Sequence, residues 1–246
     1  MSKVLILGAT SDMAVAIAKK FASEGYSLVL AARSLEKLEP LEKDLSIRYP
    51  EVNVESKAFD ARDFVSHGSF VQELEEKGLP EVSVCVFGYL GDQEAAQTDW
   101  SEAMRIIETN YVGAASVLDR LAVAYERHGR GAIVGISSVA GERGRQSNYF
   151  YGSSKAAFTA YLSGLRNRLA PKNVHVVTVK PGFVNTKMIE GMDTPKPLTA
   201  QPQEVAKTVY NAVKKSKNIV YTKSVWRPVM YAIKSIPEGL FKKLKL

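Results

Sequence analysis

The sequence predicts an α/β fold in which a doubly wound parallel sheet of seven strands is flanked by helices on both faces. Short apolar runs recur along the chain, and segments with helical spacing of their apolar residues separate them. The first run ends at Gly8, directly before such a helical segment. Because 246 residues suit one α/β domain and no linker or repeat interrupts the alternation, residues 1–246 are expected to form a single domain.

The predicted strands are short and apolar. The first run is continuous, which indicates a strand buried on both faces of a parallel sheet. In chain order, the predicted strands span residues 4–7, 27–32, 52–58, 82–87, 132–137, 174–179 and 219–222.

The predicted helices show apolar residues at intervals of three or four. In chain order, they span residues 13–23, 35–49, 64–77, 100–127, 149–169 and 204–215. Ser11 or Asp12 is placed to cap the first helix. The second carries a leucine stripe from Leu35 to Leu45, and the third ends at Gly78. Residues 183–200 contain two prolines and little periodicity, so a mobile loop is expected there.

Composition and charge narrow the function classes. The chain is 46% hydrophobic and 24% charged, which is ordinary globular composition. Its single cysteine, Cys85, excludes an internal disulfide, and it is expected to be a core thiol in a cytoplasmic protein. The net charge of +7 is mostly spread along helices among acidic residues, so no nucleic-acid partner is expected. His67, His128 and His175 lack ligand spacing, so no metal is expected.

Two residues of the helix at 149–169 point to proton chemistry. Tyr151 and Lys155 lie four residues apart, on one face of the helix. A phenol alone loses its proton near pH ~10. An ammonium group one turn away is expected to lower that pKa toward the working range. Ser138, thirteen residues before Tyr151, would place a hydroxyl near the same site.

Ser138, Tyr151 and Lys155, together with Asn110 in the segment Thr109-Asn110-Tyr111-Val112-Gly113, resemble the catalytic set of the short-chain dehydrogenase/reductase (SDR) family. The resemblance covers residues 1–222 in order and spacing. It includes two further segments, Gly8-Ala9-Thr10-Ser11 and Pro181-Gly182-Phe183-Val184-Asn185-Thr186. It implies a Rossmann-type fold, a homodimer or homotetramer, and hydride transfer between a nicotinamide and a carbonyl or secondary alcohol.

The resemblance also implies a role for each catalytic residue. Tyr151 would exchange a proton with the substrate oxygen, and Ser138 would hydrogen-bond that oxygen. Lys155 would lower the pKa of Tyr151 and hold the nicotinamide ribose. Asn110 would disturb its helix locally and hold a water.

The cofactor is expected at the ends of the strands. A helix N-terminus after Gly8 suits a pyrophosphate, and Asp12, which replaces a family glycine, is interpreted as a helix cap. Arg33 and Ser34 stand where an NAD enzyme would carry an acid, so NADP(H) is predicted; an ordinary surface arginine is the alternative. Together with the resemblance, these features imply as cofactor-binding residues Gly8, Thr10, Ser11, Asp12, Met13, Arg33, Ser34, Asp60, Ala61, Gly88, Tyr151, Lys155, Pro181, Gly182, Val184 and Thr186.

Residues 223–246 form a basic amphipathic extension beyond the usual family core. Peripheral contact with an anionic membrane is one expectation, and packing on the substrate loop or on a partner subunit is the other. The segment 87–93 and this tail resemble reductases of polyprenyl-phosphoryl 2-keto-pentose, which implies a lipid-linked keto-sugar. A dinucleotide-sensing regulator, or a membrane- or protein-binding scaffold, is the alternative to an enzyme.

Overall fold

A computed structural model describes residues 2–244 and contains a seven-stranded parallel sheet. The strands are β1 (Lys3–Leu7), β2 (Ser27–Ala32), β3 (Val54–Ala58), β4 (Val82–Cys85), β5 (Gly131–Ile136), β6 (Val174–Pro181) and β7 (Ile219–Thr222). Their order across the sheet is β3-β2-β1-β4-β5-β6-β7, so the winding reverses between β1 and β4. Open parallel sheets bind ligands at that reversal, outside the carboxyl ends of the strands. The predicted fold class is confirmed.

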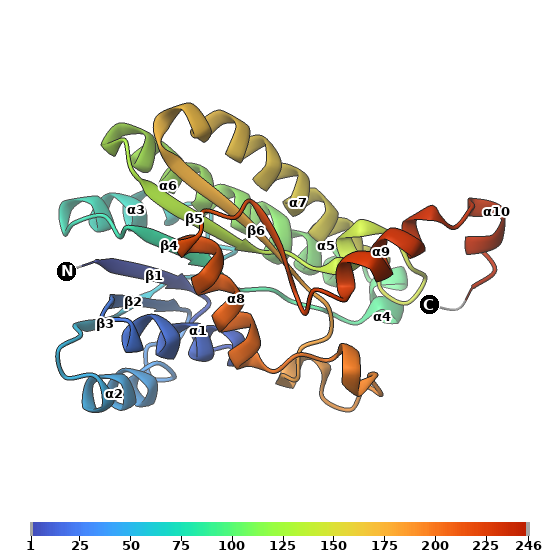
Figure 1. The fold of residues 1–246 in the computed structure, drawn as a ribbon, viewed down its shortest axis with the longest axis horizontal. Helices are drawn as coiled ribbons and strands as arrows, with labels where there is room; N and C mark the ends of the chain where they lie inside the picture. The colour runs from blue at the N-terminus through green and yellow to red at the C-terminus, as the bar shows by residue number, and fades with distance from the viewer. Residues whose placement is uncertain (1, 245–246) are drawn as a thin grey trace.

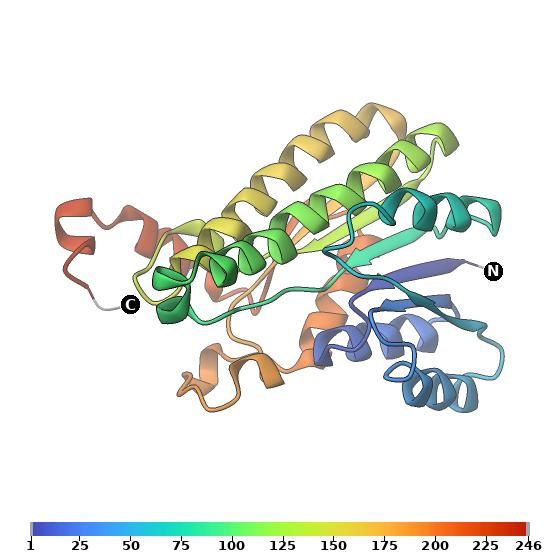
Figure 2. The same ribbon diagram turned by 180° about the vertical axis from the view of Figure 1, so that it is seen from behind.

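Helices cover both faces of the sheet (Figures 1 and 2). One face carries α1 (Asp12–Ser23), α2 (Glu39–Arg48) and α8 (Pro202–Lys214). The other face carries α3 (His67–Glu76), α6 (Gly113–His128) and α7 (Tyr149–Leu169).

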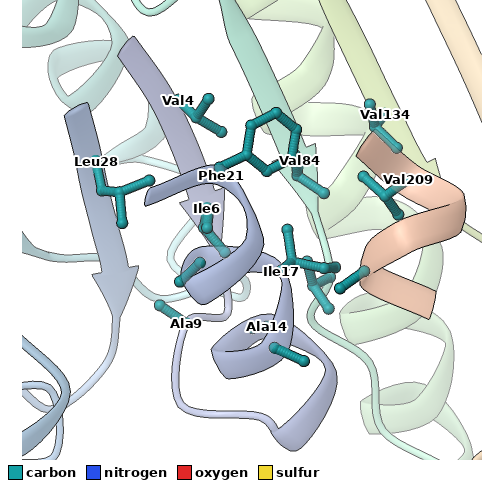
Figure 3. Close-up of a cluster of buried hydrophobic side chains, with 14 of the residues drawn as sticks. Val4, Ile6, Ala9, Ala14, Ile17, Phe21, Leu28, Val84, Val134 and Val209 are labelled. Carbon is teal, nitrogen blue, oxygen red and sulfur yellow. The ribbon is translucent and has the colours of Figure 1, made fainter. Parts of the chain in front are cut away.

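Alternation along β1 explains why its four buried residues, 4–7, are all apolar. Val4 and Ile6 belong to the buried cluster beneath α1 and α8, which Figure 3 shows. Leu5 belongs to the cluster beneath α6 and α7 on the opposite face. Successive side chains of a strand point to opposite faces, so a strand covered by helices on both sides must be apolar at every position.

The predicted long helix at 100–127 is interrupted. It consists of α5 (Trp100–Ile107), a π-helical turn (Glu108–Val112) and α6, and a short helix, α4 (Gln93–Thr98), precedes it. The predicted local disturbance at Asn110 is therefore confirmed, because Asn110 lies in the π turn. The fourth strand is shorter than predicted: the backbone N–H groups of Val86 and Phe87 both donate to the Leu7 carbonyl, which ends the regular ladder.

Other element boundaries also differ from the prediction: β3 begins at Val54 rather than at residue 52, and α3 begins at His67 rather than at residue 64. Helix α2 begins at Glu39, so Leu35 lies before it and is 48% exposed, whereas Leu38 and Leu45 are buried. The leucine stripe therefore holds only in part. The predicted loop at 183–200 contains two short 3-10 turns, Lys187–Ile189 and Lys196–Leu198.

The chain ends in two helices, α9 (Trp226–Ser235) and α10 (Glu238–Phe241), which extend beyond the body of the sheet (Figure 1). Trp226 and Met230 are buried and pack with Val139 and Phe183. Packing on the site loops, one of the two expectations for the tail, is thus observed; Lys245 and Leu246 lie outside the described residues. No helix among residues 2–244 is both long and apolar enough to cross a membrane.

Candidate active site

A cavity of about 660 Å³ opens at the carboxyl ends of β4, β5 and β6. It brings together residues that are far apart in the sequence. From the predicted set, it is lined by Met13, Gly88, Ser138, Tyr151, Lys155, Pro181, Gly182, Val184 and Thr186. Ser138, Tyr151 and Lys155, which the family resemblance implies as catalytic, therefore share one cavity, and Asn110 lies next to Gly88 in its wall.

Tyr151 and Lys155 project from the first turns of α7, and Ser138 follows β5. Lys155 is almost fully buried, and its Nζ donates a hydrogen bond to the Ile136 carbonyl at 3.0 Å. The same Nζ lies 5.8 Å from the centroid of the Tyr151 ring. Ser138 Oγ accepts from the Ala140 N–H at 3.1 Å, and the Ser138 hydroxyl also hydrogen-bonds the Tyr151 phenol.

The pKa values of this pair differ from the expectation. Burial raises the pKa of Tyr151 to about 12, and a hydrogen bond from Ser138 offsets only part of that rise. Burial lowers the pKa of Lys155 to about 8. The expectation that Lys155 lowers the pKa of Tyr151 is therefore wrong for this structure. The reason is desolvation of the phenol, with the ammonium group directed toward Ile136.

Asn110 is buried and holds the loop after β4 in place. Its Oδ1 accepts from the Tyr89 N–H at 3.1 Å, and its Nδ2 donates to the Tyr89 carbonyl at 2.6 Å and to the Ile106 carbonyl at 2.8 Å. A methyl group built on Gly88 would lie 3.0 Å from Asn110 Oδ1 and 3.4 Å from Lys155 Nζ. The glycine thus lets the loop pass close to both side chains.

A second, smaller cavity of about 190 Å³ adjoins the first across the reversal between β1 and β4. The two cavities share Met13, Val86, Gly88 and Met188. The predicted residues that line the second cavity are Gly8, Thr10, Ser11, Met13, Arg33, Asp60, Ala61 and Gly88.

Sequence reasoning missed two arginines in this second cavity, Arg62 and Arg105. Arg62 pairs with Glu108 at 2.9 Å, and the Arg105 guanidinium lies 4.3 Å from the Tyr89 ring centroid. Arg62 could have been found, because it directly follows Asp60-Ala61 in the sequence. Arg105 lies on α5, and its neighbours in the sequence give no indication that it faces this cavity.

The turn after β1 has the geometry that a close backbone approach requires. Gly8 has φ +88°, a region that favours glycine, and its N–H donates to the Ala31 carbonyl at 2.8 Å. Ser11 caps α1, since its Oγ accepts from the Ala14 N–H at 3.2 Å. Asp12 does not cap the helix as interpreted from the sequence. Its Oδ2 accepts from the Lys187 N–H at 2.9 Å instead, across 175 residues.

Ser34 does not reach either cavity. Its Oγ accepts from the Lys37 N–H at 3.3 Å, which stabilises the turn before α2. Arg33 does line the smaller cavity, with an exposed side chain. Of the predicted Arg33–Ser34 pair, only the arginine faces the site.

The tail contributes Trp226 to the wall of the larger cavity, a contribution that sequence reasoning did not specify. Trp226 Nε1 donates to the Leu198 carbonyl at 3.1 Å. A methyl group on Gly182 would lie 1.9 Å from the Trp226 ring, so only glycine permits this packing. Helix α9 and the loop after β6 therefore form one wall.

Two residues that are not expected to take part in catalysis or metal binding, Cys85 and His67, lie in the core. Cys85 is buried, and burial raises the pKa of its thiol to about 12, which confirms it as an unreactive core thiol. His67 is buried, with its ring nitrogens bonded to Ser116 Oγ and the Asp60 carbonyl. Within residues 2–244, no group of three or more His, Cys, Asp or Glu side chains is placed to hold a metal ion.

The paired cavities fit a dinucleotide. They cross the sheet where its winding reverses, and Gly8 provides a turn at the N-terminus of α1. Three arginines line the smaller cavity, whereas an acid for the ribose hydroxyls is absent from the described end of β2, which reads Ala31-Ala32-Arg33. This charge distribution suits a ribose that carries a phosphate.

Comparisons with known proteins agree with this geometry. A family profile described as short chain dehydrogenase matches residues 2–196. An uncharacterized oxidoreductase of Mycobacterium tuberculosis is 37% identical over 243 residues, which cover 98% of this chain and 96% of that protein. A sulfoacetaldehyde reductase of Chromohalobacter salexigens is 36% identical over 188 residues, 75% of this chain and 73% of the relative.

Solved structures share the fold. A short-chain dehydrogenase from Sphingobium yanoikuyae in complex with NADPH superposes with a TM-score of 0.84 at 24% sequence identity. The match covers 99% of this chain and 96% of that one.

Proposed function

The chain belongs to the short-chain dehydrogenase family, and from that premise we propose that it is an NADP(H)-dependent oxidoreductase that interconverts a carbonyl and an alcohol. The observation that carries the proposal is the convergence of Ser138, Tyr151 and Lys155 on one cavity beside Gly88. A regulator that only senses a dinucleotide would have no need for this set of acid, oxygen donor and buried ammonium group.

The proposed cofactor is NADP(H). Arg33 is proposed to bind the 2′-phosphate, and Arg62 and Arg105 add positive charge to the same small cavity. The loop 181–186 is proposed to cover the nicotinamide. When bound, the cofactor supplies or accepts the hydride.

The chain's own residues handle the proton. With its pKa raised to about 12, Tyr151 is a phenol at neutral pH, so it is placed to donate a proton to a substrate carbonyl oxygen. The hydroxyl of Ser138, which hydrogen-bonds Tyr151, is proposed to bond the same substrate oxygen. The ammonium group of Lys155, which lines the same cavity, is proposed to hold the nicotinamide ribose.

A panel of aldehydes and ketones with NADPH tests the proposal. We expect Tyr151→Phe to lower kcat about 1,000-fold, the scale of general acid catalysis. Tyr149→Phe is the matched control, because this neighbouring phenol does not line the cavity and should leave the rate unchanged. Equal rates for the wild type and Tyr151→Phe would overturn the assignment. NADPH binding without turnover of any carbonyl would favour the dinucleotide-sensing regulator.

A narrower proposal concerns the tail and a lipid-linked keto-sugar. It is supported by the exposed side chains Tyr231, Leu240 and Leu244, which lie among the exposed bases Lys242 and Lys243. Because Trp226 in the same segment lines the cavity, membrane contact would bring a lipid-linked substrate to the site. Pelleting with anionic vesicles should recover the wild type but not Lys242→Glu/Lys243→Glu; equal recovery would contradict membrane contact.

The protein is also proposed to be a cytoplasmic homodimer or homotetramer, because members of the family commonly form such oligomers. Analytical ultracentrifugation tests the size of the oligomer.

A further inference from the structure

One wall of the larger cavity holds polar atoms without partners. Among the described residues, few buried side-chain nitrogen or oxygen atoms lack a hydrogen bond, and three of these line this cavity. They are Arg145 Nε, Gln93 Nε2 and Asn148 Oδ1. Buried polar groups are nearly always paired in folded proteins, so a cluster of unpaired ones inside a cavity points to a ligand.

Arg145 is the most unusual of the three. No carboxylate among residues 2–244 forms an ion pair with it, and its recorded contact is a hydrogen bond from Nη2 to the Met230 sulfur at 3.7 Å. Burial lowers the pKa of this guanidinium. By contrast, Arg143 is fully engaged with Glu238 and the carbonyls of α9. A partly buried cation without a partner is costly to the fold, and an anion in the cavity would remove that cost.

The acids nearest this wall do not serve as partners. Asp92 and Glu94 also line the cavity, but Asp92 Oδ1 accepts from the Glu94 and Ala95 N–H groups and so caps α4. Glu142 is already bound to Lys180 and Lys234.

Gln93 is fixed in an orientation that presents a donor. Its Oε1 accepts from the Phe150 N–H at 3.1 Å, so its Nε2 is the group left unpaired. Arg145 and Gln93 therefore offer two donors to one cavity. Asn148 Oδ1 is an acceptor and would take a substrate hydroxyl rather than an anion.

We propose that the carbonyl substrate carries an anionic group, a carboxylate, sulfonate or phosphate, that binds to Arg145 and Gln93 while its carbonyl lies at Ser138 and Tyr151. This inference rests on the proposed function, because it assigns a substrate class to the same cavity. The anion site is separate from the cofactor's phosphates, since Arg145 does not line the smaller cavity that holds Arg33.

Kinetics with NADPH and matched aldehydes test the anion site. The carboxylate arm pairs succinic semialdehyde with its methyl ester, and the other arms compare sulfoacetaldehyde and glycolaldehyde phosphate with glycolaldehyde. We expect the wild type to favour at least one anionic aldehyde by about 100-fold in kcat/KM, the scale of a buried charge pair. Arg145→Met should lose that preference and still reduce the neutral partner. Arg227→Met, an exposed arginine on α9 outside the cavity, should behave as the wild type.

Equal kcat/KM for charged and neutral aldehydes in the wild type, or a preference that survives in Arg145→Met, overturns the anion site. In both cases turnover of neutral aldehydes leaves the proposed function standing.

A binding measurement separates this proposal from the function itself. The product alcohols 4-hydroxybutyrate, 2-hydroxyethanesulfonate and 2-hydroxyethyl phosphate can be titrated by calorimetry into the NADP-loaded protein. We expect at least one to bind the wild type, and Arg145→Met to bind it at least about tenfold more weakly. Such binding without turnover of any aldehyde or ketone of the panel supports the anion site and overturns the oxidoreductase function. No binding of any product to the wild type overturns the anion site.

Discussion

Asp12 Oδ2 and the backbone N–H of Lys187 form a hydrogen bond of 2.9 Å that joins the turn after β1 to the loop after β6. These two segments lie on opposite sides of the adjoining cavities, since Ser11 and Met13 line one side and Thr186 and Met188 the other. An acid would repel phosphates bound at this turn, but here it holds the loop after β6, which is proposed to cover the nicotinamide. The replacement of a glycine by Asp12 therefore has a structural role.

Removing the Asp12 acceptor should loosen the loop over the cofactor. We expect Asp12→Ala to raise the KM for NADPH about fivefold, which corresponds to the net value of roughly 1 kcal/mol for one hydrogen bond. Asp12→Asn keeps an oxygen acceptor and should stay close to the wild type. If Asp12 instead repels the phosphates, both variants would bind NADPH more tightly than the wild type, which would refute a loop-holding role for the Asp12–Lys187 hydrogen bond.

Lys155 should limit the stability of the protein below pH 8. The pKa of Lys155 is about 8 in the folded state and 10.5 in the unfolded chain. Below pH 8 the lysine is therefore protonated in both the folded and the unfolded state, and the folded state bears the full free-energy cost of a buried charge. Between pH 8 and 10.5 the folded state loses the proton first, and stability rises with pH. The difference between these two pKa values corresponds to about 3 kcal/mol in the free energy of unfolding.

Urea unfolding of Lys155→Met checks this cost. We expect the variant to be inactive, to be more stable than the wild type at pH 7 by up to about 3 kcal/mol, and to lose most of that advantage at pH 9.5. Lys180→Met is the control, because this buried lysine is paired with Glu142 at 3.2 Å and its loss should destabilise the fold. A Lys155→Met protein that is less stable than the wild type at pH 7 would show that the buried charge is compensated.

Arg143 should fasten the C-terminal helices to the site. Its Nη1 donates to the carbonyls of Ile233, Lys234 and Ile236, its Nη2 pairs with Glu238, and its guanidinium lies 3.8 Å from the Phe241 ring centroid. We expect Arg143→Ala to speed tryptic cleavage within 234–243 at least about tenfold, because several charge-assisted bonds are lost together.

Arg143→Lys keeps the charge but lacks the planar fork, so it should resemble Arg143→Ala more than the wild type. Cleavage at the wild-type rate in both variants would mean that Trp226 and Met230 alone hold the tail.

Structural features that depend on residues close together in the sequence could be predicted from the sequence. Tyr151 and Lys155 share one helical turn, so their spacing alone places them together. Arg33 directly follows a predicted strand, and the carboxyl ends of parallel strands meet at one edge of the sheet. The alternation of strands and helices likewise fixed the fold class.

Contacts between distant segments could not be predicted. The Asp12–Lys187 bond and the packing of Trp226 on Gly182 depend on how loops meet in three dimensions. The pKa of Tyr151 shows the same limit: its sequence neighbour Lys155 predicts a lowered pKa, but burial in the folded protein raises it. Arg145 gave no signal because only tertiary structure reveals that a charged side chain has no partner.

The most direct test of an NADP(H)-dependent site is a fluorescence titration of the protein with NADPH and NADH, repeated with Arg33→Ala. We predict that the wild type binds NADPH at least about 30-fold more tightly than NADH, the scale of a charge-assisted hydrogen-bond pair, and that Arg33→Ala loses this preference. Lys37→Ala, an exposed neighbour outside both cavities, should keep it. Equal affinity of the wild type for the two cofactors, or binding of neither, would contradict the account.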